Sequence, residues 1–266
     1  MKVIVVANQK GGVGKTSSAV EIAACLVYEG KKVLFIDLDQ QVNSTTYLGL
    51  PKVQTVPTSY EVLCGDAPII ESIQRRNFKG VGDIDVIPAS EKLSTIEKLF
   101  PEAEDVFMLA DRIDELDENE NINYDYVIID TNPARDQLLK MSYATSDYAI
   151  IPTMSDRGSL DGIVNIYSDI KKFRDGRLPF TQIQVLGLIL TRYERSLSYV
   201  NAFEDLVSIA NAMSEKPFVD KVRKSIAMSD CKDIGVPLLS FDKYNNASLD
   251  YKRIAQEIIK RTEGED

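Results

Sequence analysis

A short glycine-rich segment near the start of the chain carries a lysine at each end, and this combination suits the binding of phosphate. It reads KGGVGKTS and spans residues 10–17. Glycines let backbone N–H groups crowd around a phosphate, and Lys15 supplies a positive charge to the β- and γ-phosphates of a nucleotide. The hydroxyl of Thr16 can bind Mg²⁺ where a helix begins. The candidate nucleotide-binding residues are Lys10, Gly11, Gly12, Val13, Gly14, Lys15, Thr16 and Ser17.

The loop departs from the usual phosphate-binding pattern G-x-x-x-x-G-K-[ST]. Gln9 stands where that pattern has its first glycine, and Lys10 is a lysine that the pattern does not require. Lys15 already supplies the one lysine that the pattern requires, so the presence of Lys10 needs a separate explanation. The plain alternative is that Lys10 is a solvated loop residue.

Aspartates close two of the apolar segments of the chain. Asp37 and Asp39 lie at the end of FIDLD, and Asp130 ends YDYVIID. A strand that ends in aspartate beside a phosphate loop is typical of a Walker B residue, which holds Mg²⁺ through water. Asp130 is therefore a candidate metal-binding residue, and the alternative is an aspartate that caps the following helix.

The composition narrows the chemistry further. The 266 residues contain no histidine, so catalysis must rest on carboxylates, lysines, backbone amides and a metal. The three cysteines are far apart and form no C-x-x-C, which argues against a disulfide framework or a zinc site. The net charge of −10, taken over the whole chain, argues against nucleic acid as a partner. Residues 216–232 nevertheless hold five lysines and arginines, and residues 102–120 hold nine acidic residues.

Apolar runs alternate with amphipathic segments along the chain. Strands are predicted at residues 2–7, 32–37, 83–90, 124–130, 147–153, 183–191 and 216–222. Helices are predicted most clearly at residues 16–28, 159–173, 197–213 and 249–261. Continuous apolar strands between helices indicate a doubly wound α/β fold, with a mostly parallel sheet covered on both faces. Ligands bind such folds at the carboxyl ends of the strands, where the loop and the aspartates lie.

No linker interrupts the pattern, so we expect one domain over residues 1–266. No apolar run approaches the roughly 18 residues of a membrane span. The apolar segment before the loop is too short for a signal peptide. These features predict a cytoplasmic protein.

The arrangement K-G-G-x-G-K-[ST] resembles the deviant Walker A motif of the ParA/MinD family of ATPases. The resemblance implies a dimer in which two subunits sandwich two ATP molecules. Lys15 would bind the phosphates of its own subunit, and Lys10 would reach the phosphates of the partner's ATP. A cation that faces a triphosphate across an interface favours dimers when ATP is bound, and it can act like an arginine finger supplied in trans.

The segment FIDLDQQVNSTT is similar to the family pattern D-L-D-P-Q-G-N-x-T. The resemblance implies that Asp37 belongs to the Mg²⁺ environment together with Thr16 and Asp130. It also implies that Asp39 positions the attacking water, with Lys10 and Lys15 as the other catalytic residues. Gln40 replaces the usual proline and Val42 the usual glycine, which puts the hydrolysis rate in question.

Two later segments also resemble the family. IIPTMSDRGSLDGI matches P-T-x-x-E-x-x-[AS]-L-x-G with Asp156 in place of glutamate, and this segment usually lies at the dimer face. GLILTR ends at Thr191, where the family has a polar residue near the adenine. Residues 222–242 look like the corresponding stretch of plasmid-type ParA proteins.

The resemblance implies a DNA-partitioning ATPase. Such a protein dimerises on ATP, binds DNA without sequence preference, and is released when a centromere-binding, ParB-like partner stimulates hydrolysis. It is nucleoid-associated when ATP is bound. Arg223 and Lys224 are the candidate DNA-binding residues, because non-specific binding is electrostatic. The alternative is that these residues are solvated surface charges.

Other functions remain to be weighed. A membrane positioner of the MinD type needs a basic amphipathic helix, and the segment EIIKRTEGED is acidic. A nitrogenase-type reductase needs cluster-binding cysteines in segments that have none. A related ATPase that positions a protein cargo, and a nucleotide-dependent dimer switch with little hydrolysis, stay open. The acidic stretch 102–120 is interpreted as the exposed face of a helix or a surface for a basic partner.

Overall fold

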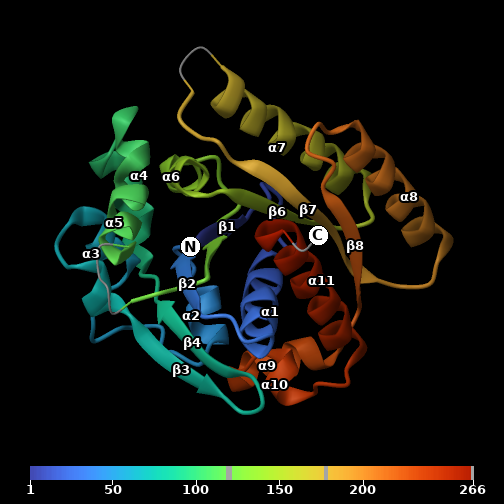
Figure 1. Ribbon diagram of the computed structural model, residues 1–266, viewed down its shortest axis with the longest axis horizontal. Helices are drawn as coiled ribbons and strands as arrows, with labels where there is room; N and C mark the ends of the chain where they lie inside the picture. Colours follow the sequence, from blue (N-terminus) through green and yellow to red (C-terminus); the bar gives the residue numbers. More distant parts are fainter. Residues whose placement is uncertain (118–121, 177–178, 265–266) are drawn as a thin grey trace.

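The computed structural model describes residues 1–117, 122–176 and 179–264. Within these residues, eight strands form one sheet in the order β3-β4-β2-β5-β1-β6-β7-β8 (Figure 1). Only β3 and β4 pair in antiparallel fashion, and the other neighbours are parallel. The strands are β1 Lys2–Val6, β2 Val33–Leu38, β3 Gln74–Phe78, β4 Gly82–Ile87, β5 Tyr126–Thr131, β6 Tyr148–Thr153, β7 Gln184–Tyr193 and β8 Phe218–Arg223.

Helices cover both faces of the sheet, as the two hydrophobic cores show. One core joins the sheet to α1 Lys15–Tyr28, α2 Asn43–Tyr47, α9 Ala227–Ile234, α10 Leu238–Phe241 and α11 Asn246–Glu263. The other core joins it to α3 Ser59–Cys64, α4 Ile96–Leu99, α5 Met108–Asp117, α6 Gln137–Thr145, α7 Arg157–Asp175 and α8 Leu197–Ala212. Three 3₁₀ turns, η1 Ile69–Ser72, η2 Glu91–Thr95 and η3 Glu104–Phe107, complete the second layer.

The central strand β1 contacts both hydrophobic cores, and this explains why its sequence is apolar at successive positions. Val3 and Val5 belong to one core, and Ile4 and Val6 belong to the other. Successive side chains of a strand point to opposite faces, so a strand with helices on both sides needs an apolar residue at every position. This arrangement confirms the doubly wound α/β fold expected from the sequence.

The seven predicted strands are present with shifts of a few residues at their ends. The sequence does not predict β3, whose residues QRRNF are mostly polar. This strand lies at the edge of the sheet, where only its partner β4 binds it. Charged residues are favoured on such edges because they prevent further strand pairing.

The acidic stretch 102–120 runs through η3 and α5, and residues 118–120 lie outside the described part. Helix α5 buries Leu109, Ile113 and Leu116 against the core, while Asp111 and Asp114 are exposed. This described part is the exposed face of a helix. Among the described residues, no helix combines the length and apolar character needed to cross a membrane.

A buried carboxylate, Glu21 on α1, ties together three helices that stand behind the loop. Its Oε1 accepts hydrogen bonds from the hydroxyl of Tyr47 on α2 at 2.7 Å and from the backbone N–H of Leu238 on α10 at 2.8 Å. Its Oε2 has no partner among the described residues. Burial raises the pKa of Glu21 to about 7, although the two hydrogen bonds oppose this shift. The fold therefore favours the protonated form of this side chain.

The pH dependence of stability should change in the variant Glu21→Gln. Because the pKa of Glu21 is raised on folding, its contribution to stability is complete below about 4.5 and is lost as the pH rises through about 7. The wild-type protein should therefore lose on the order of 2–3 kcal/mol relative to the variant between pH 5 and pH 8. Urea unfolding across this range measures the difference, and parallel curves for the two proteins would contradict the assignment.

Candidate nucleotide-binding site

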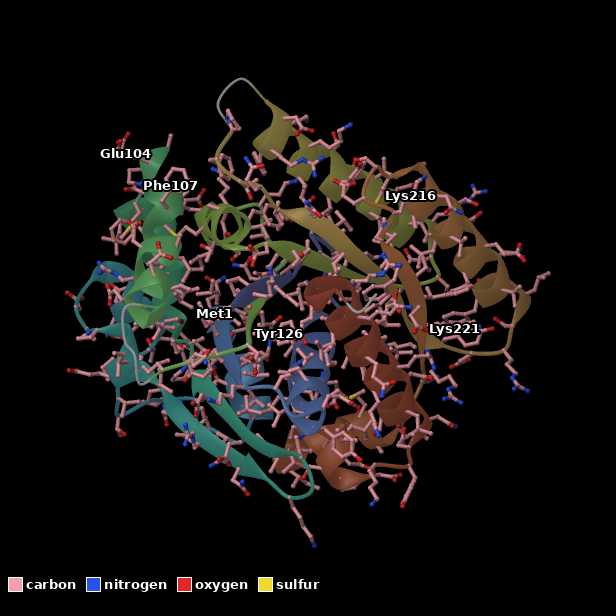
Figure 2. The ribbon with its side chains drawn as sticks, in the orientation of Figure 1. Met1, Glu104, Phe107, Tyr126, Lys216 and Lys221 are labelled. Carbon is pink, nitrogen blue, oxygen red and sulfur yellow. The ribbon has the colours of Figure 1, made fainter. Side chains whose placement is uncertain are left out.

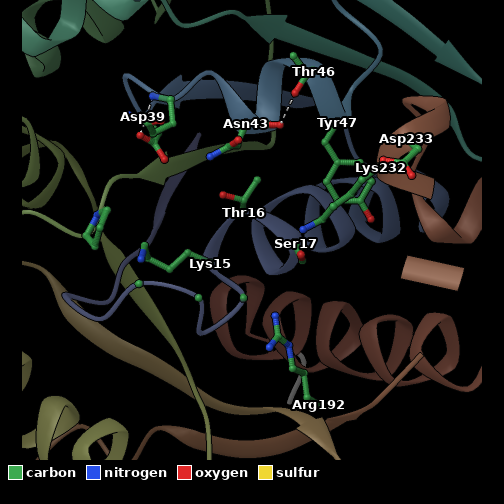
Figure 3. A pocket seen from close by; sticks show the side chains of 15 residues that line it. Lys15, Thr16, Ser17, Asp39, Asn43, Thr46, Tyr47, Arg192, Lys232 and Asp233 are labelled. Atoms are coloured by element: carbon green, nitrogen blue, oxygen red, sulfur yellow. Dashed lines mark hydrogen bonds between the residues drawn. The ribbon is translucent and has the colours of Figure 1, made fainter. Parts of the chain in front are cut away.

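The glycine-rich loop joins β1 to α1 at the carboxyl edge of the sheet. Gly12 and Gly14 have φ of 76° and 91°, in the left-handed region that glycine adopts at little cost. Helix α1 begins directly after Gly14, so its free N–H groups face the loop. A cavity of about 540 Å³ opens over the loop and is lined by Gly11, Gly12, Gly14, Lys15, Thr16 and Ser17 (Figure 3).

Hydrogen bonds from neighbouring strands hold the loop in this shape. The side chain of Asn8 accepts from the N–H of Lys10 at 2.9 Å and donates to the carbonyl of Pro152 at 2.7 Å. Lys15 Nζ donates to the carbonyl of Lys10 at 3.0 Å, across the loop. Burial lowers the pKa of Lys15, while the charges of Asp130 and Asp39 oppose this change. Lys15 is thus a nearly buried cation that lines the cavity, and its binding of phosphates stays a prediction.

The parallel register of the sheet places Asp37 of β2 directly opposite Asp130 of β5. Both residues are fully buried. The carboxylate of Asp37 accepts the N–H of Asp39 and, from Thr45, both the N–H at 2.9 Å and the hydroxyl at 2.6 Å. Asp37 therefore fixes the start of α2 and the turn that carries Asp39.

Asp130 is in a different situation. Neither of its carboxylate oxygens has a hydrogen-bond partner among the described residues. Burial and the nearby Asp37 carboxylate raise the pKa of Asp130, and the Thr16 and Ser44 hydroxyls oppose this in part. An unpartnered buried carboxylate is costly unless a cation compensates it. Carboxylate and hydroxyl oxygens are the ligands that Mg²⁺ prefers, so Asp130 and Thr16 fit such an ion.

Asp39 lies at the wall of the cavity. Its Oδ1 accepts the N–H of Gln41 at 2.9 Å, which orients the carboxylate (Figure 3). Its Oδ2 has no hydrogen-bond partner within the part of the chain that the structure describes. Among the predicted carboxylates, Asp39 is the one that lines the cavity. The geometry leaves this oxygen available for a water molecule.

Lys10 lies on the outer edge of the loop, and 40% of its side chain is exposed. Its Nζ forms an ion pair with Asp156 and donates a hydrogen bond to the hydroxyl of Ser159 at 2.9 Å. Both partners stand at the N-terminus of α7, where Asp156 is the N-cap. Lys10 and Ser159 lower the pKa of Asp156 to about 2. The two lysines of the loop thus face different ways, with Lys15 inside and Lys10 outside.

Thr191 lies behind the loop. It is buried, and its hydroxyl is within 2.9 Å of the carbonyls of Val13 and Thr153. A side chain on Gly14 would meet its methyl group at 3.3 Å. Thr191 also lines a second hollow of about 350 Å³ that adjoins the first at Gly14 and Ser17. The hydroxyl of Thr191 already binds backbone carbonyls, so it is not free to bind adenine. A contact between its methyl group and adenine stays a prediction.

The predicted DNA-binding residues are both engaged in ion pairs. The guanidinium of Arg223 binds the carboxylate of Asp250 at 2.8 Å and also reaches Asn246. Lys224 binds Glu194 at 2.6 Å, and both of these side chains are exposed. Asp250 is buried, so Arg223 has a structural task, whereas Lys224 forms a surface pair that solvent screens.

Sequence reasoning missed two cations that line the main cavity. Arg192 follows Thr191 on β7, and Lys232 comes from α9. In the sequence, Lys232 is one of the five cations of the basic segment 216–232. The signal for Arg192 was its place at the carboxyl end of an apolar strand, and no such local signal exists for Lys232.

Comparisons with known proteins agree with this geometry. Residues 1–183 match a family model described as an AAA domain. The chromosome partitioning protein ParA of Caulobacter vibrioides is 31% identical over 98% of this chain and 95% of its own length. The chain belongs to the ParA family of partitioning ATPases.

Solved structures show the same relationship. A putative plasmid partition protein from Borrelia burgdorferi, determined with AMPPNP bound, is 26% identical over 98% of this chain and 99% of its own, with a TM-score of 0.76. McdA from Cyanothece, determined as an ATP complex, is 23% identical over 97% and 96% of the two chains and has a TM-score of 0.81. McdA shares the fold of this chain. The family model and the ParA relative, and not McdA, are what assign the loop to a P-loop nucleotide-binding protein.

The hydroxyl of Thr191 can be tested by a pair of variants. Thr191→Val removes the single hydroxyl proton that the carbonyls of Val13 and Thr153 share and should lower the free energy of unfolding by about 1–2 kcal/mol. Thr191→Ser keeps the hydroxyl and should retain most of that stability. Urea unfolding measures both, and a larger loss for Thr191→Ser than for Thr191→Val would assign the effect to packing of the methyl group and not to the hydroxyl.

Proposed function

We propose that this chain is a single-domain, Mg²⁺-dependent ATPase that drives the segregation of a plasmid or chromosome. It dimerises when ATP is bound, binds DNA without sequence preference, and hydrolyses ATP when a ParB-like, centromere-binding partner stimulates it. It acts in the cytoplasm on the nucleoid. The observation that carries the proposal is the pair of loop lysines, one buried in the phosphate cradle and one exposed on its outer edge.

The residues within one subunit divide the work. The loop amides and Lys15 bind the phosphates, because they already surround the space at the N-terminus of α1. Thr16 and Asp130 would hold Mg²⁺, with Asp37 behind them. A bound Mg²⁺ neutralises charge on the phosphates. Asp39 presents its free oxygen to the cavity and orients the attacking water, which is most of what phosphoryl transfer asks of a protein.

Lys10 acts on the ATP of the partner subunit. In the free subunit it is held by Asp156 and Ser159, at the surface that would face a second copy. A triphosphate carries more negative charge than one carboxylate, so a partner's bound ATP can take Lys10 from Asp156. The same exchange is weaker with ADP, which lacks the γ-phosphate. This difference makes dimerisation depend on the nucleotide.

The DNA surface would lie along β8 and the segment after it. Figure 2 shows Lys216 and Lys221 on this side of the molecule, far from Glu104 and Phe107 beside α5. The labelled residues of the acidic and basic segments therefore lie on different sides of the molecule, which is compatible with a basic face despite the negative total charge. Lys224 can exchange Glu194 for a DNA phosphate at little cost, because both are exposed. Arg223 would also bind a DNA phosphate, while its ion pair with Asp250 stays intact.

The proposal is tested by recording mass in solution and binding to a generic DNA duplex, with no nucleotide, ADP or ATP. We expect dimers and DNA binding with ATP alone, and binding that weakens as salt rises. Lys10→Ala should bind ATP with nearly wild-type affinity and yet form no ATP-dependent dimer. Asp156→Asn breaks the same ion pair and keeps the lysine, so it should still dimerise.

A normal dimer of Lys10→Ala would contradict the role in trans. ATP-dependent dimers that ignore DNA would contradict the partition function and leave a nucleotide switch or a positioner of protein cargo. For the surface itself, Lys224→Gln should weaken DNA binding, while Lys98→Gln, an exposed lysine on α4, serves as the matched control. Equal DNA affinities for these two variants would place the surface elsewhere.

The two aspartates should separate metal binding from hydrolysis. Asp130→Asn removes the unpartnered buried carboxylate, so Mg²⁺ should no longer raise the affinity for ATP. Asp39→Asn keeps Asp130 and should preserve the Mg²⁺ effect while hydrolysis falls by about a hundredfold or more, as expected for the loss of a water-positioning group. Nucleotide titrations with Mg²⁺ or EDTA, together with phosphate release, measure both. An unchanged Mg²⁺ effect in Asp130→Asn would contradict the assignment.

A further inference from the structure

Arg192 holds an unusual backbone conformation at the end of β7. Its φ is 54°, in the left-handed region where residues with a side chain are strained. The pairing of β7 with β8 changes register at this point, between Leu190 and Tyr193. The side chain lines the cavity over the phosphate loop and the adjoining hollow. Strain of this kind at a cavity wall is typical of a residue kept for a function.

Arg192 has a neighbour of the same charge. Lys232 of α9 lines the same two cavities, and the two cations are close enough that Arg192 lowers the pKa of Lys232, after burial as the larger cause. Among the described residues, neither cation forms an ion pair or a hydrogen bond. Asp233 also lines the main cavity but pairs with neither. Lys232 Nζ lies over the ring of Tyr47, 5.4 Å from its centroid, but no carboxylate of the described residues neutralises either cation. Two such cations beside one cavity are suited to bind an anion.

Their position relative to the loop indicates which anion. Lys15 and Asp39 mark the end of the cavity where the γ-phosphate would be transferred. Figure 3 shows Ser17 and Lys232 on the other side of Thr16, with Arg192 beyond the loop. A nucleotide whose β- and γ-phosphates lie over Lys15 must place its α-phosphate on that other side, at the N-terminal turn of α1.

We propose that Arg192 and Lys232 bind the α-phosphate of the nucleotide from β7 and α9, and so grip ATP and ADP alike. This inference rests on the proposed nucleotide-binding function. It gives the site two groups of cations, with Lys15 on the outer phosphates and the pair of Arg192 and Lys232 on the phosphate next to the ribose. The subunit would then keep its nucleotide after the γ-phosphate has left. The strained backbone of Arg192 is what turns its side chain toward this position.

Nucleotide titrations of Arg192→Gln test the proposal, with ATP, ADP, AMP and adenosine as probes in competition with a fluorescent ADP analogue. A lost charge-assisted hydrogen bond should weaken ATP, ADP and AMP by a similar factor of about tenfold or more, and leave adenosine unchanged. Lys232→Gln should show the same pattern. Arg195→Gln is the matched control, since Arg195 is an exposed arginine three residues away that lines neither cavity.

Other patterns would overturn the proposal. A loss for ATP alone would place the pair at the γ-phosphate, and an equal loss for adenosine would place it at the base. Wild-type affinities for every probe, with weaker DNA binding, would make Arg192 part of a DNA surface. If the wild-type protein itself bound no nucleotide, the proposed function would fail, and this outcome is distinct from all the others.

The variant Arg192→Gly separates the side chain from the fold. Glycine adopts the left-handed conformation without strain, so the melting temperature should equal or exceed that of the wild type. The affinity for ADP should still fall about tenfold, because the guanidinium is gone. A lower melting temperature together with unchanged affinity would show that Arg192 serves the fold and not the ligand.

Discussion

The parallel pairing of β2 with β5 places two carboxylates side by side in the interior, and much of the site follows from this constraint. Asp37 and Asp130 occupy the same level of adjacent strands, next to the loop that leaves β1. Two buried carboxylates on neighbouring strands repel each other when both are charged, and burial removes their hydration. Three hydrogen bonds to Asp37 and the nearby buried ammonium of Lys15 offset part of this repulsion and lost hydration. Within the described part of the chain, neither carboxylate oxygen of Asp130 has a hydrogen-bond partner.

The second layer of the site keeps these groups in place. Thr45 binds Asp37 and also accepts the N–H of Ala89 after β4, so α2 is anchored at its start. Tyr47 at the other end of α2 binds Glu21 inside α1. The helix that carries Thr16 and the helix that follows Asp39 are therefore joined through a buried carboxylate. A displacement of α1 or α2 relative to the other would break the buried hydrogen bond between Tyr47 and Glu21.

Much of this arrangement is predictable from sequence, because its signals are local. The loop, its two lysines and the aspartates at strand ends are read from residue type and spacing, and the strands from continuous apolar runs. The edge strand β3 is missed because an edge selects polar residues, which mask the strand pattern. The pairing of Lys10 with Asp156 and of Arg223 with Asp250 depends on residues far apart in the chain, which periodicity does not report. The place of Lys232 in the cavity wall is likewise not predictable, because the loop that it faces lies more than 200 residues away in the chain.

The cavity is assembled from distant parts of the chain, with the phosphate loop near residue 15 and its opposite wall near residues 192 and 232. Helix α1 packs against α11, and Ser18 bonds Tyr251 at 3.0 Å, so the loop's own helix is also completed by late residues. Chains are synthesised from the N-terminus, and contacts of long sequence separation form late. The loop is thus made long before the wall that encloses it. The cavity over the loop is therefore incomplete in a nascent chain until almost all of the chain has left the ribosome.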